Sequence, residues 1–278
     1  MRATLRRFAL GLATLFGRPR GFFIPYRYAG LQPPRPLPAV SAAERLFKRA
    51  EPTMRARLAA VEGYGIDLAA IAGPAPEPRF DQDWFPTLDA AMLYTLVREQ
   101  RPARIVEVGS GHSTRFLVRA ARDGGLTRTA IEAIDPAPRA DLAGLPVTLH
   151  RRTLGEADLP RLASLSAGDM LVIDSSHILM PGSDVDLLLS RLLPELASGV
   201  FVHLHDVFLP DDYPAAWWWR GYNEQNAILP MLLAGNWRVE FASHYLLTRA
   251  GEAVQRSVVA RLPAKPGAHA ASLWLRKT

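Results

Sequence analysis

Residues 105–113 read Ile-Val-Glu-Val-Gly-Ser-Gly-His-Ser, and no other stretch of the chain says more about its architecture. A β-branched run leads to Glu107, and Gly109 and Gly111 then flank a serine before a helical pattern begins. This order predicts a strand, a tight turn and a helix start that bring backbone close to a ligand. Glycine is needed there because a Cβ atom would block either the turn or the ligand's approach.

Short apolar strands and helical segments alternate from about residue 81 onward. We predict strands at 104–108, 129–134, 146–150, 169–174 and 199–205, and helices at 87–100, 112–122, 158–165 and 183–197. A helix near 221–234 and strands near 237–247 and 271–276 complete the pattern. Near-continuous hydrophobic strands between helices are typical of a buried, mainly parallel sheet, so the sequence predicts an α/β fold. Ligands of such sheets bind beyond the carboxyl ends of the strands.

Residues 1–80 are predicted to form a basic N-terminal extension with helices and proline-rich linkers, and residues 81–278 to form the main domain. Prolines exclude helix and central strand from residues 31–38 and 72–80. The pattern Ser41-Ala-Ala-Glu44 resembles a capping box and predicts a helix start, with Pro52 interrupting or restarting that helix.

The charge of the chain is concentrated at its start. Residues 1–35 contain seven arginines and no acidic residue, so subtracting +7 from the net charge of +6 leaves −1 for the remainder. Nothing in the main domain therefore indicates nucleic-acid binding. The chain has no cysteine, which excludes disulfides, thiolate zinc sites and cysteine nucleophiles. A bound metal would need carboxylate, imidazole or water ligands.

The apolar run from Phe8 to Phe16 follows three arginines and is similar to a signal peptide, but no small-x-small cleavage site follows it. It is too short to span a bilayer. Leu5, Phe8, Leu12 and Leu15 lie at helical spacing. This pattern indicates an amphipathic helix that either docks on the protein or contacts an anionic membrane through residues 1–28. We expect a cytoplasmic protein, with peripheral contact at the inner membrane face as the alternative. The sequence leaves homo-oligomer formation open.

Polar residues follow four of the predicted strands. The turn after the first strand offers Gly109, Ser110 and Gly111 to a ligand, and Asp135 ends the second strand, where an acid can bind both hydroxyls of a ribose. Asp135 alone fits NAD and S-adenosylmethionine equally. The fourth strand ends in Asp174, with His177 three residues later, and the fifth ends in His205-Asp206.

The acid-x-Gly-x-Gly pattern of residues 107–111 resembles motif I of class I S-adenosylmethionine-dependent methyltransferases more than an NAD site, because Ser113 stands where a dinucleotide fingerprint has its third glycine. The resemblance implies a doubly wound, Rossmann-like seven-stranded sheet whose last strand is antiparallel. It also implies a set of cofactor-binding residues, namely Glu107, Gly109, Ser110, Gly111, Ser113, Asp135, Asp158 and Asp174. For Asp158, near the expected adenine position, helix capping is an equally good interpretation.

Asp174-x-x-His177 together with His205-Asp206 resembles the macrocin-type sugar O-methyltransferases and their cephalosporin-hydroxylase-like relatives. That resemblance implies metal ligands Asp174, His205 and Asp206, with Mg²⁺ or Mn²⁺ as the ion, and His177 as the general base. His205 departs from the family pattern, in which a second carboxylate occupies this position, and an imidazole shifts the preference toward softer metals. Three alternatives remain. Asp206 caps the next segment, His177 occupies a non-catalytic loop position, or His203 has a structural role. For His112 the sequence does not separate cofactor contact from solvent exposure.

The sequence therefore predicts an O-methyltransferase that acts on a hydroxyl of a sugar, glycoconjugate or small metabolite, with one of the tryptophans at 217–219 available to stack on the acceptor or bury a partner surface. The alternatives are an NAD-dependent oxidoreductase, a non-catalytic cofactor-binding scaffold or sensor, and a metal-free methyltransferase. The short-chain form of the oxidoreductase is excluded, since none of Lys48, Lys265 and Lys277 follows a tyrosine by four residues.

Overall fold

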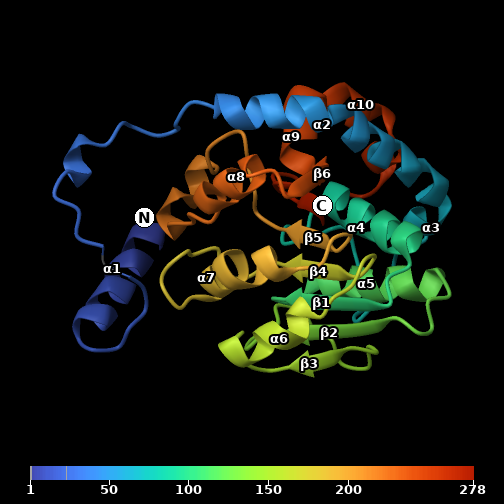
Figure 1. Ribbon diagram of the computed structural model, residues 1–278, viewed down its shortest axis with the longest axis horizontal. Helices are drawn as coiled ribbons and strands as arrows, with labels where there is room; N and C mark the ends of the chain where they lie inside the picture. Colours follow the sequence, from blue (N-terminus) through green and yellow to red (C-terminus); the bar gives the residue numbers. More distant parts are fainter. Residues whose placement is uncertain (1, 23) are drawn as a thin grey trace.

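The computed structural model describes residues 2–22 and 24–278. Residues 1 and 23, which belong to the segment predicted to contact a membrane, lie outside the described residues. A seven-stranded mixed sheet forms the centre of the molecule (Figure 1), with the strand order β3-β2-β1-β4-β5-β7-β6. Its strands are β1 Arg104–Val108, β2 Ala130–Ile134, β3 Thr148–His150, β4 Met170–Ile173, β5 Phe201–Leu204, β6 Trp237–Ala242 and β7 Leu273–Lys277.

The pairing of the strands matches the predicted fold class. β7 is antiparallel to both of its neighbours, β5 and β6, whereas the pairs among β1 to β5 are parallel. The connection from β1 to β2 and the connection from β4 to β5 run in opposite directions along the sheet. Because such crossovers are right-handed, their helices cover opposite faces. The prediction of a doubly wound, Rossmann-like α/β fold is confirmed.

Helices flank this sheet on both sides. α4 packs against α5 on one face, and α6 packs against the helical segment 184–195 on the other. α2, α8 and α9 lie toward the β6 edge. The α-helices are α1 Arg2–Leu15, α2 Ser41–Ala60, α3 Gly65–Ala69, α4 Thr87–Gln100, α5 His112–Asp123, α6 Leu159–Ala163, α7 Asp184–Asp186, α8 Gln225–Leu233, α9 Ser243–Arg249 and α10 Gly251–Arg256. Among the described residues, no helix is both long and apolar enough to cross a membrane.

Three local predictions need correction. The strand expected at 237–247 ends at Ala242, and α9 begins at Ser243 because Tyr245 and Leu246 are buried on the side of α9 that meets α2. α2 runs through Pro52 without a break, since this proline is exposed and the carbonyl it leaves without a donor can reach water. The capping box is absent because Glu44 pairs with Arg249 instead, at 2.5 Å.

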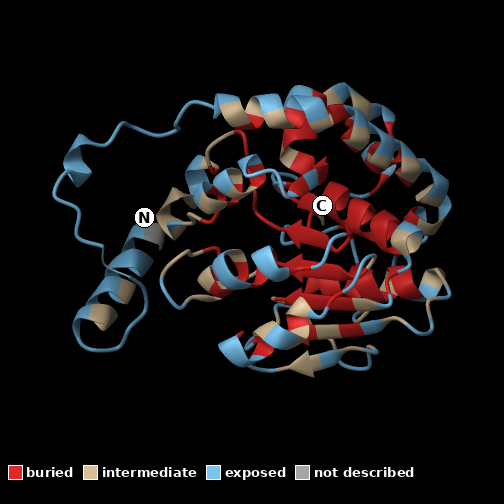
Figure 2. Cartoon of the chain, viewed as in Figure 1, coloured by how far each residue is buried: buried red, intermediate tan, exposed pale blue. Residues whose placement is uncertain are grey.

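The hydrophobic core continues across the predicted boundary at residue 80. Phe47, Met54 and Leu58 of α2 are buried and belong to the same apolar cluster as the sheet. By contrast, residues 4–22 and 24–40 are almost entirely exposed and form an arm that extends from the body of the protein (Figure 2). We call residues 2–22 and 24–40 the N-terminal arm.

The turn after β1 brings two strands into close backbone contact. Gly109 has φ +85°, and a Cβ atom on it would lie 1.8 Å from the carbonyl oxygen of Asp174 at the end of β4. The Asp174 N–H donates a hydrogen bond to the Val108 carbonyl at 2.9 Å. The absence of a side chain at Gly109 therefore permits both the turn and the close packing of the end of β4 against it, and this packing fixes the position of Asp174.

Replacing Gly109 tests this contact. We expect Gly109→Ala to lower the free energy of unfolding by about 3 kcal/mol, because both the strained φ and the collision with Asp174 oppose the added methyl group. Gly125→Ala is the matched control, since Gly125 also has a positive φ of +61° but open space around it. Its expected cost is about 1–2 kcal/mol. Urea unfolding measures both values, and equal costs would contradict the proposed collision.

Candidate active site

Two adjoining cavities lie at the carboxyl ends of the parallel strands. The larger cavity has a volume of about 480 Å³ and is walled by residues that follow β1, β2, β3 and β4, including Gly109, Ser110, Asp135, Thr153 and Asp184. The smaller cavity has a volume of about 270 Å³ and is walled by His177, His205, Asp206, Trp84, Trp217 and Tyr222, among others. Arg139, Asp174 and Ser175 line both cavities. Asp174 is therefore at the junction between two binding spaces.

Asp135 is held rigidly on the wall of the larger cavity. The backbone N–H and the hydroxyl of Ser110 donate hydrogen bonds to its Oδ2 at 2.6 and 2.9 Å, and the Ala137 N–H donates to its Oδ1 at 2.7 Å. Each carboxylate oxygen retains acceptor capacity beyond these bonds. The second strand thus ends in a preorganised carboxylate, as the sequence predicted.

Ser175 supplies an unused polar group at the junction. Its Oγ is buried and has no hydrogen-bond partner among the residues that the structure describes. Buried hydroxyls are normally paired, so an orphaned one on the wall of a cavity indicates a ligand or ordered water as its partner.

Of the predicted cofactor-binding residues, Gly109, Ser110, Asp135 and Asp174 line the larger cavity. The other four do not line either cavity within the part of the chain that the structure describes; they are Glu107, Gly111, Ser113 and Asp158. Asp158 instead accepts hydrogen bonds from Arg152 at 2.5 Å and Arg161 at 3.3 Å, and these bonds hold the pKa of its carboxyl well below the usual value. Direct cofactor contact by these four residues stays a prediction.

Glu107 organises the turn from beneath. Its side chain is fully buried and accepts hydrogen bonds from the hydroxyls of Ser113 and Thr114, both at 2.5 Å. Thr114 in turn accepts the N–H of Gly111 at 2.9 Å. Burial raises the pKa of Glu107 to about 8, although the two hydroxyls favour its ionised form. Glu107 and Ser113 therefore determine how α5 starts.

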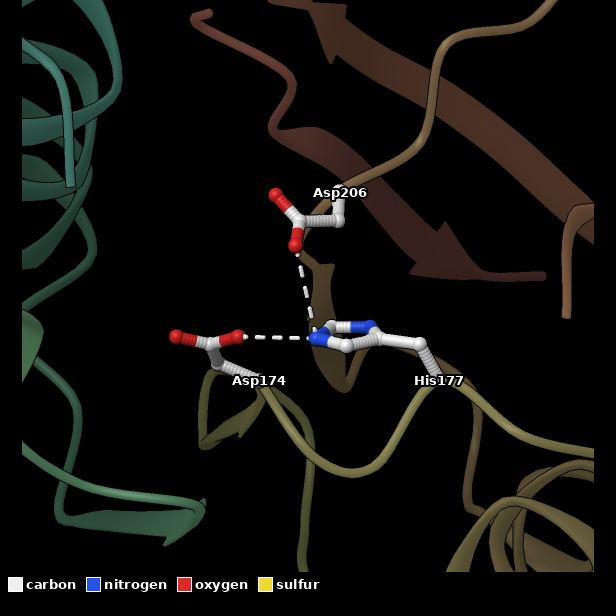
Figure 3. Close-up of side chains that lie close together, drawn as sticks. All are labelled: Asp174, His177 and Asp206. Carbon is white, nitrogen blue, oxygen red and sulfur yellow. Dashed lines mark ion pairs between the residues drawn. The ribbon is translucent and has the colours of Figure 1, made fainter. Parts of the chain in front are cut away.

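The residues predicted for catalysis and metal binding line the smaller cavity, and Figure 3 shows three of them, Asp174, His177 and Asp206. His177 Nε2 lies 3.3 Å from Asp174 Oδ1 and 3.4 Å from Asp206 Oδ2. These three residues can each offer one ligand atom within 4.8 Å of the others, a geometry suited to a metal ion. His205 Nδ1 faces the same two aspartates at 3.6 and 3.3 Å. His177 and Asp206 both have left-handed backbone angles, with φ of 61° and 58°, and such strain is concentrated at functional sites.

A buried carboxylate stands behind each histidine, and the sequence analysis identified neither one. Glu224 lies 2.5 Å from His177 Nδ1, and Asp89 lies 3.3 Å from His205 Nε2. Asp89 also accepts the Ser243 hydroxyl at 2.5 Å and the backbone N–H groups of Ala271 and Ser272. Asp89 could have been noticed from the sequence, because it is an acid in the mainly apolar helix 87–100. Glu224 could not, because its contact with His177 is made only in the tertiary fold.

The neighbouring carboxylates favour the protonated form of both rings. Burial disfavours a charged ring, but the charge of Glu224 and the hydrogen bonds to Asp174 and Glu224 raise the pKa of His177 well above its usual value. Burial opposes protonation of His205 as well, and the charges of Asp206 and Asp174 raise its pKa well above the usual value. Burial raises the pKa of Asp206 and of Glu224 despite their histidine neighbours.

Two further histidines, His203 and His112, are not among the residues that line either cavity. His203 is fully buried and lies 2.7 Å from the Ser272 hydroxyl through Nε2, and burial lowers its pKa to about 3. It is a neutral, structural histidine. His112 is buried at the start of α5, where burial lowers its pKa to about 4.

Comparison with known proteins identifies a domain in the central part of the chain. Residues 106–207 match a family model described as a methyltransferase domain. This match supports the prediction of a methyltransferase domain, and the strand order agrees with the doubly wound sheet that was predicted. Among solved structures, the chain is similar to the O-methyltransferase TomG from Streptomyces achromogenes, involved in tomaymycin synthesis and solved in complex with S-adenosylmethionine. The identity is 17%, the TM-score is 0.43, and the match covers 80% of this chain and 89% of TomG. No curated protein matches the chain.

The buried acid beneath the turn gives a pH-dependent prediction. A folded-state pKa of about 8, above the ordinary 4.5, means that Glu107 stabilises the fold below about pH 4.5 and that this contribution is lost as the pH rises through 8. The free energy of unfolding of Glu107→Gln minus that of the wild type should therefore increase by at least about 1 kcal/mol when the pH is raised from about 5 to about 9. Urea unfolding across this range measures the difference, and a pH-independent difference would show that Glu107 is ionised in the fold.

Proposed function

We propose that the protein transfers the methyl group of S-adenosylmethionine to a hydroxyl of a sugar, glycoconjugate or similar small metabolite. The observation that carries this proposal is the junction at Asp174, where a cavity suited to a nucleoside meets a second cavity that contains His177 and Asp206. A transfer reaction needs two such adjoining spaces because donor and acceptor must meet in line.

The larger cavity fits the cofactor by its donor and acceptor groups. The fixed carboxylate of Asp135 can accept both ribose hydroxyls, and the free hydroxyl of Ser175 faces the junction where the methyl-bearing end would lie. Bound S-adenosylmethionine supplies an electrophilic methyl group, and S-adenosylhomocysteine is the second product. The chain's own part is to hold the nucleoside and exclude water from the junction.

His177 is the proposed general base. Glu224 at Nδ1 fixes the tautomer of the neutral ring, which leaves the Nε2 lone pair directed at Asp174, Asp206 and the smaller cavity. Nε2 can then accept the proton of an acceptor hydroxyl, and Glu224 stabilises the imidazolium that forms. Glu224, Asp174 and Asp206 together raise the pKa of His177 well above its usual value, and a cation held by the two aspartates would oppose this shift and favour the neutral ring that accepts a proton.

Asp174, Asp206 and His205 are the proposed ligands of a divalent ion such as Mg²⁺ or Mn²⁺, because His177, which also lies within reach of both aspartates, is assigned to the proton. Two carboxylate oxygens and an imidazole nitrogen form an acceptable donor set, and Asp89 behind His205 is the kind of carboxylate partner that orients metal-bound histidines. The ion would lower the pKa of a coordinated acceptor hydroxyl, which otherwise attacks a methyl sulfonium poorly.

The smaller cavity presents aromatic faces to the acceptor. Trp84 and Trp217 line it, each with an arginine (Arg139 and Arg220) 4.2 Å from its ring centroid. Trp218 and Trp219 are absent from its described walls and are approached by Arg35 and Arg6 instead. Flat apolar surfaces next to charged groups suit the two faces and the hydroxyl groups of a sugar ring.

Two substitutions separate cofactor binding from catalysis. We expect Asp135→Asn to weaken S-adenosylhomocysteine binding about tenfold, because a charged hydrogen-bond acceptor is lost. His177→Ala should leave that affinity within about twofold of the wild type and abolish methyl transfer. Calorimetric titration measures the affinities, and radiolabelled methyl transfer to a screened panel of sugars measures turnover. Normal turnover by His177→Ala would refute the base assignment.

Metal binding should be coupled to proton release. Because the pKa values of His177 and His205 are raised, Mn²⁺ must displace protons, and its affinity should increase as the pH rises toward those values. Calorimetry in buffers of different ionisation enthalpy counts the protons released. Asp206→Asn should abolish the binding, whereas Asp81→Asn, at an exposed carboxylate, should leave it unchanged. Affinity that does not vary with pH would contradict the proposed ligand set.

A further inference from the structure

The N-terminal arm carries most of the exposed apolar surface of the protein. Among the described residues, sixteen large apolar side chains are exposed, and twelve of these lie between Leu5 and Val40. Five of them, Leu5, Phe8, Leu12, Leu15 and Phe16, are spaced three, four, three and one residue apart along α1 and its end, and therefore share one side of the helix. Phe8 is 66% exposed and Leu15 is 81% exposed. A soluble surface rarely leaves such a stripe uncovered.

The charges of the arm have one sign. Residues 1–35 contain seven arginines and no acid. Arg35 pairs with Asp212, which fastens the arm to the body. Within the described part of the chain, no ion pair involves the five arginines Arg6, Arg7, Arg18, Arg20 and Arg27. The positive charges of Arg7, Arg18 and Arg20 are thus available to an anionic partner, while Arg6 and Arg27 also lie over the rings of Trp219 and Tyr28.

We propose that α1 docks the protein on an anionic lipid bilayer, with the apolar stripe at the level of the lipid headgroups and the arginines among the phosphates. An apolar stripe next to unpaired arginines fits a surface that combines hydrocarbon with negative charge. The 14 residues of α1 are too few to span a bilayer, so the helix lies in the plane of the membrane.

The position of α1 connects this docking surface to the smaller cavity. α1 contacts the short 3₁₀ helix η6 (Ala215–Arg220), with Arg6 5.4 Å from the ring centroid of Trp219 (Figure 1). η6 also supplies Ala216, Trp217 and Arg220 to the wall of the smaller cavity. Docking through α1 would therefore hold the smaller cavity near the membrane surface.

Vesicle co-sedimentation with the full chain tests the proposal without any need for methyl transfer. We expect binding to vesicles of phosphatidylcholine mixed with phosphatidylglycerol, little binding to phosphatidylcholine alone, and weakening as salt is raised. Arg7→Gln and Arg18→Gln should each reduce the partition coefficient about fivefold. Arg128→Gln, at an exposed position outside the arm, should leave it unchanged.

The apolar stripe has its own matched pair of variants. Phe8→Asp should abolish vesicle binding, whereas Ile66→Asp, at a side chain 89% exposed on α3, should not affect it. Because both side chains are exposed, the thermal unfolding of both variants should stay close to that of the wild type. Equal binding to neutral and anionic vesicles, or binding retained by Phe8→Asp, would overturn the proposal. A dimer in solution that Phe8→Asp converts to monomer would assign the stripe to a second copy of the chain and overturn it equally.

Discussion

The close backbone contact between Gly109 and Asp174 is the constraint on which the arrangement of the site depends. It aligns the ends of β1 and β4, the two central strands from which the connections diverge. The connection that follows β1 covers one face of the sheet and the connection that follows β4 covers the other, so a crevice opens at the carboxyl ends of these two strands. Asp174 lies in this crevice, shared by the larger and the smaller cavity, and the other candidate residues are arranged around it.

A cluster of charged side chains lies in and behind the wall of the smaller cavity. Each imidazole in this cluster is flanked by acids: Asp174 and Asp206 lie between the two rings, with Asp89 behind His205 and Glu224 behind His177, so each charge has an opposite neighbour. Burying charges is costly unless they are paired, and such clusters persist mainly where chemistry requires them. With four carboxylates against two rings, the cluster has a negative excess that suits a cation. The left-handed backbone at His177 and Asp206 fits the same interpretation.

The sequence predicted the fold and the strand-end residues because both follow from local patterns. Alternating apolar strands and helices define the sheet, and residues directly after a strand must lie at its edge. Asp174, His177, His205 and Asp206 are accordingly found together. Spacing could not show that Glu224, from a distant segment, lies behind His177, or that Asp158 is held by two arginines. Those contacts depend on packing between elements far apart in the chain, as does the helix that replaces the expected strand after Ala242.

In the proposed reaction the methyl-bearing end of the cofactor would lie at the junction beside Asp174, next to a divalent ion held by Asp174, Asp206 and His205. Nuclear magnetic resonance of protein-bound S-adenosylmethionine carrying a ¹³C-labelled methyl group, titrated with Mn²⁺, tests this placement directly. We expect the paramagnetic ion to broaden the methyl resonance far more than the adenine protons. Comparable broadening of both, or none while Mn²⁺ is bound, would contradict it.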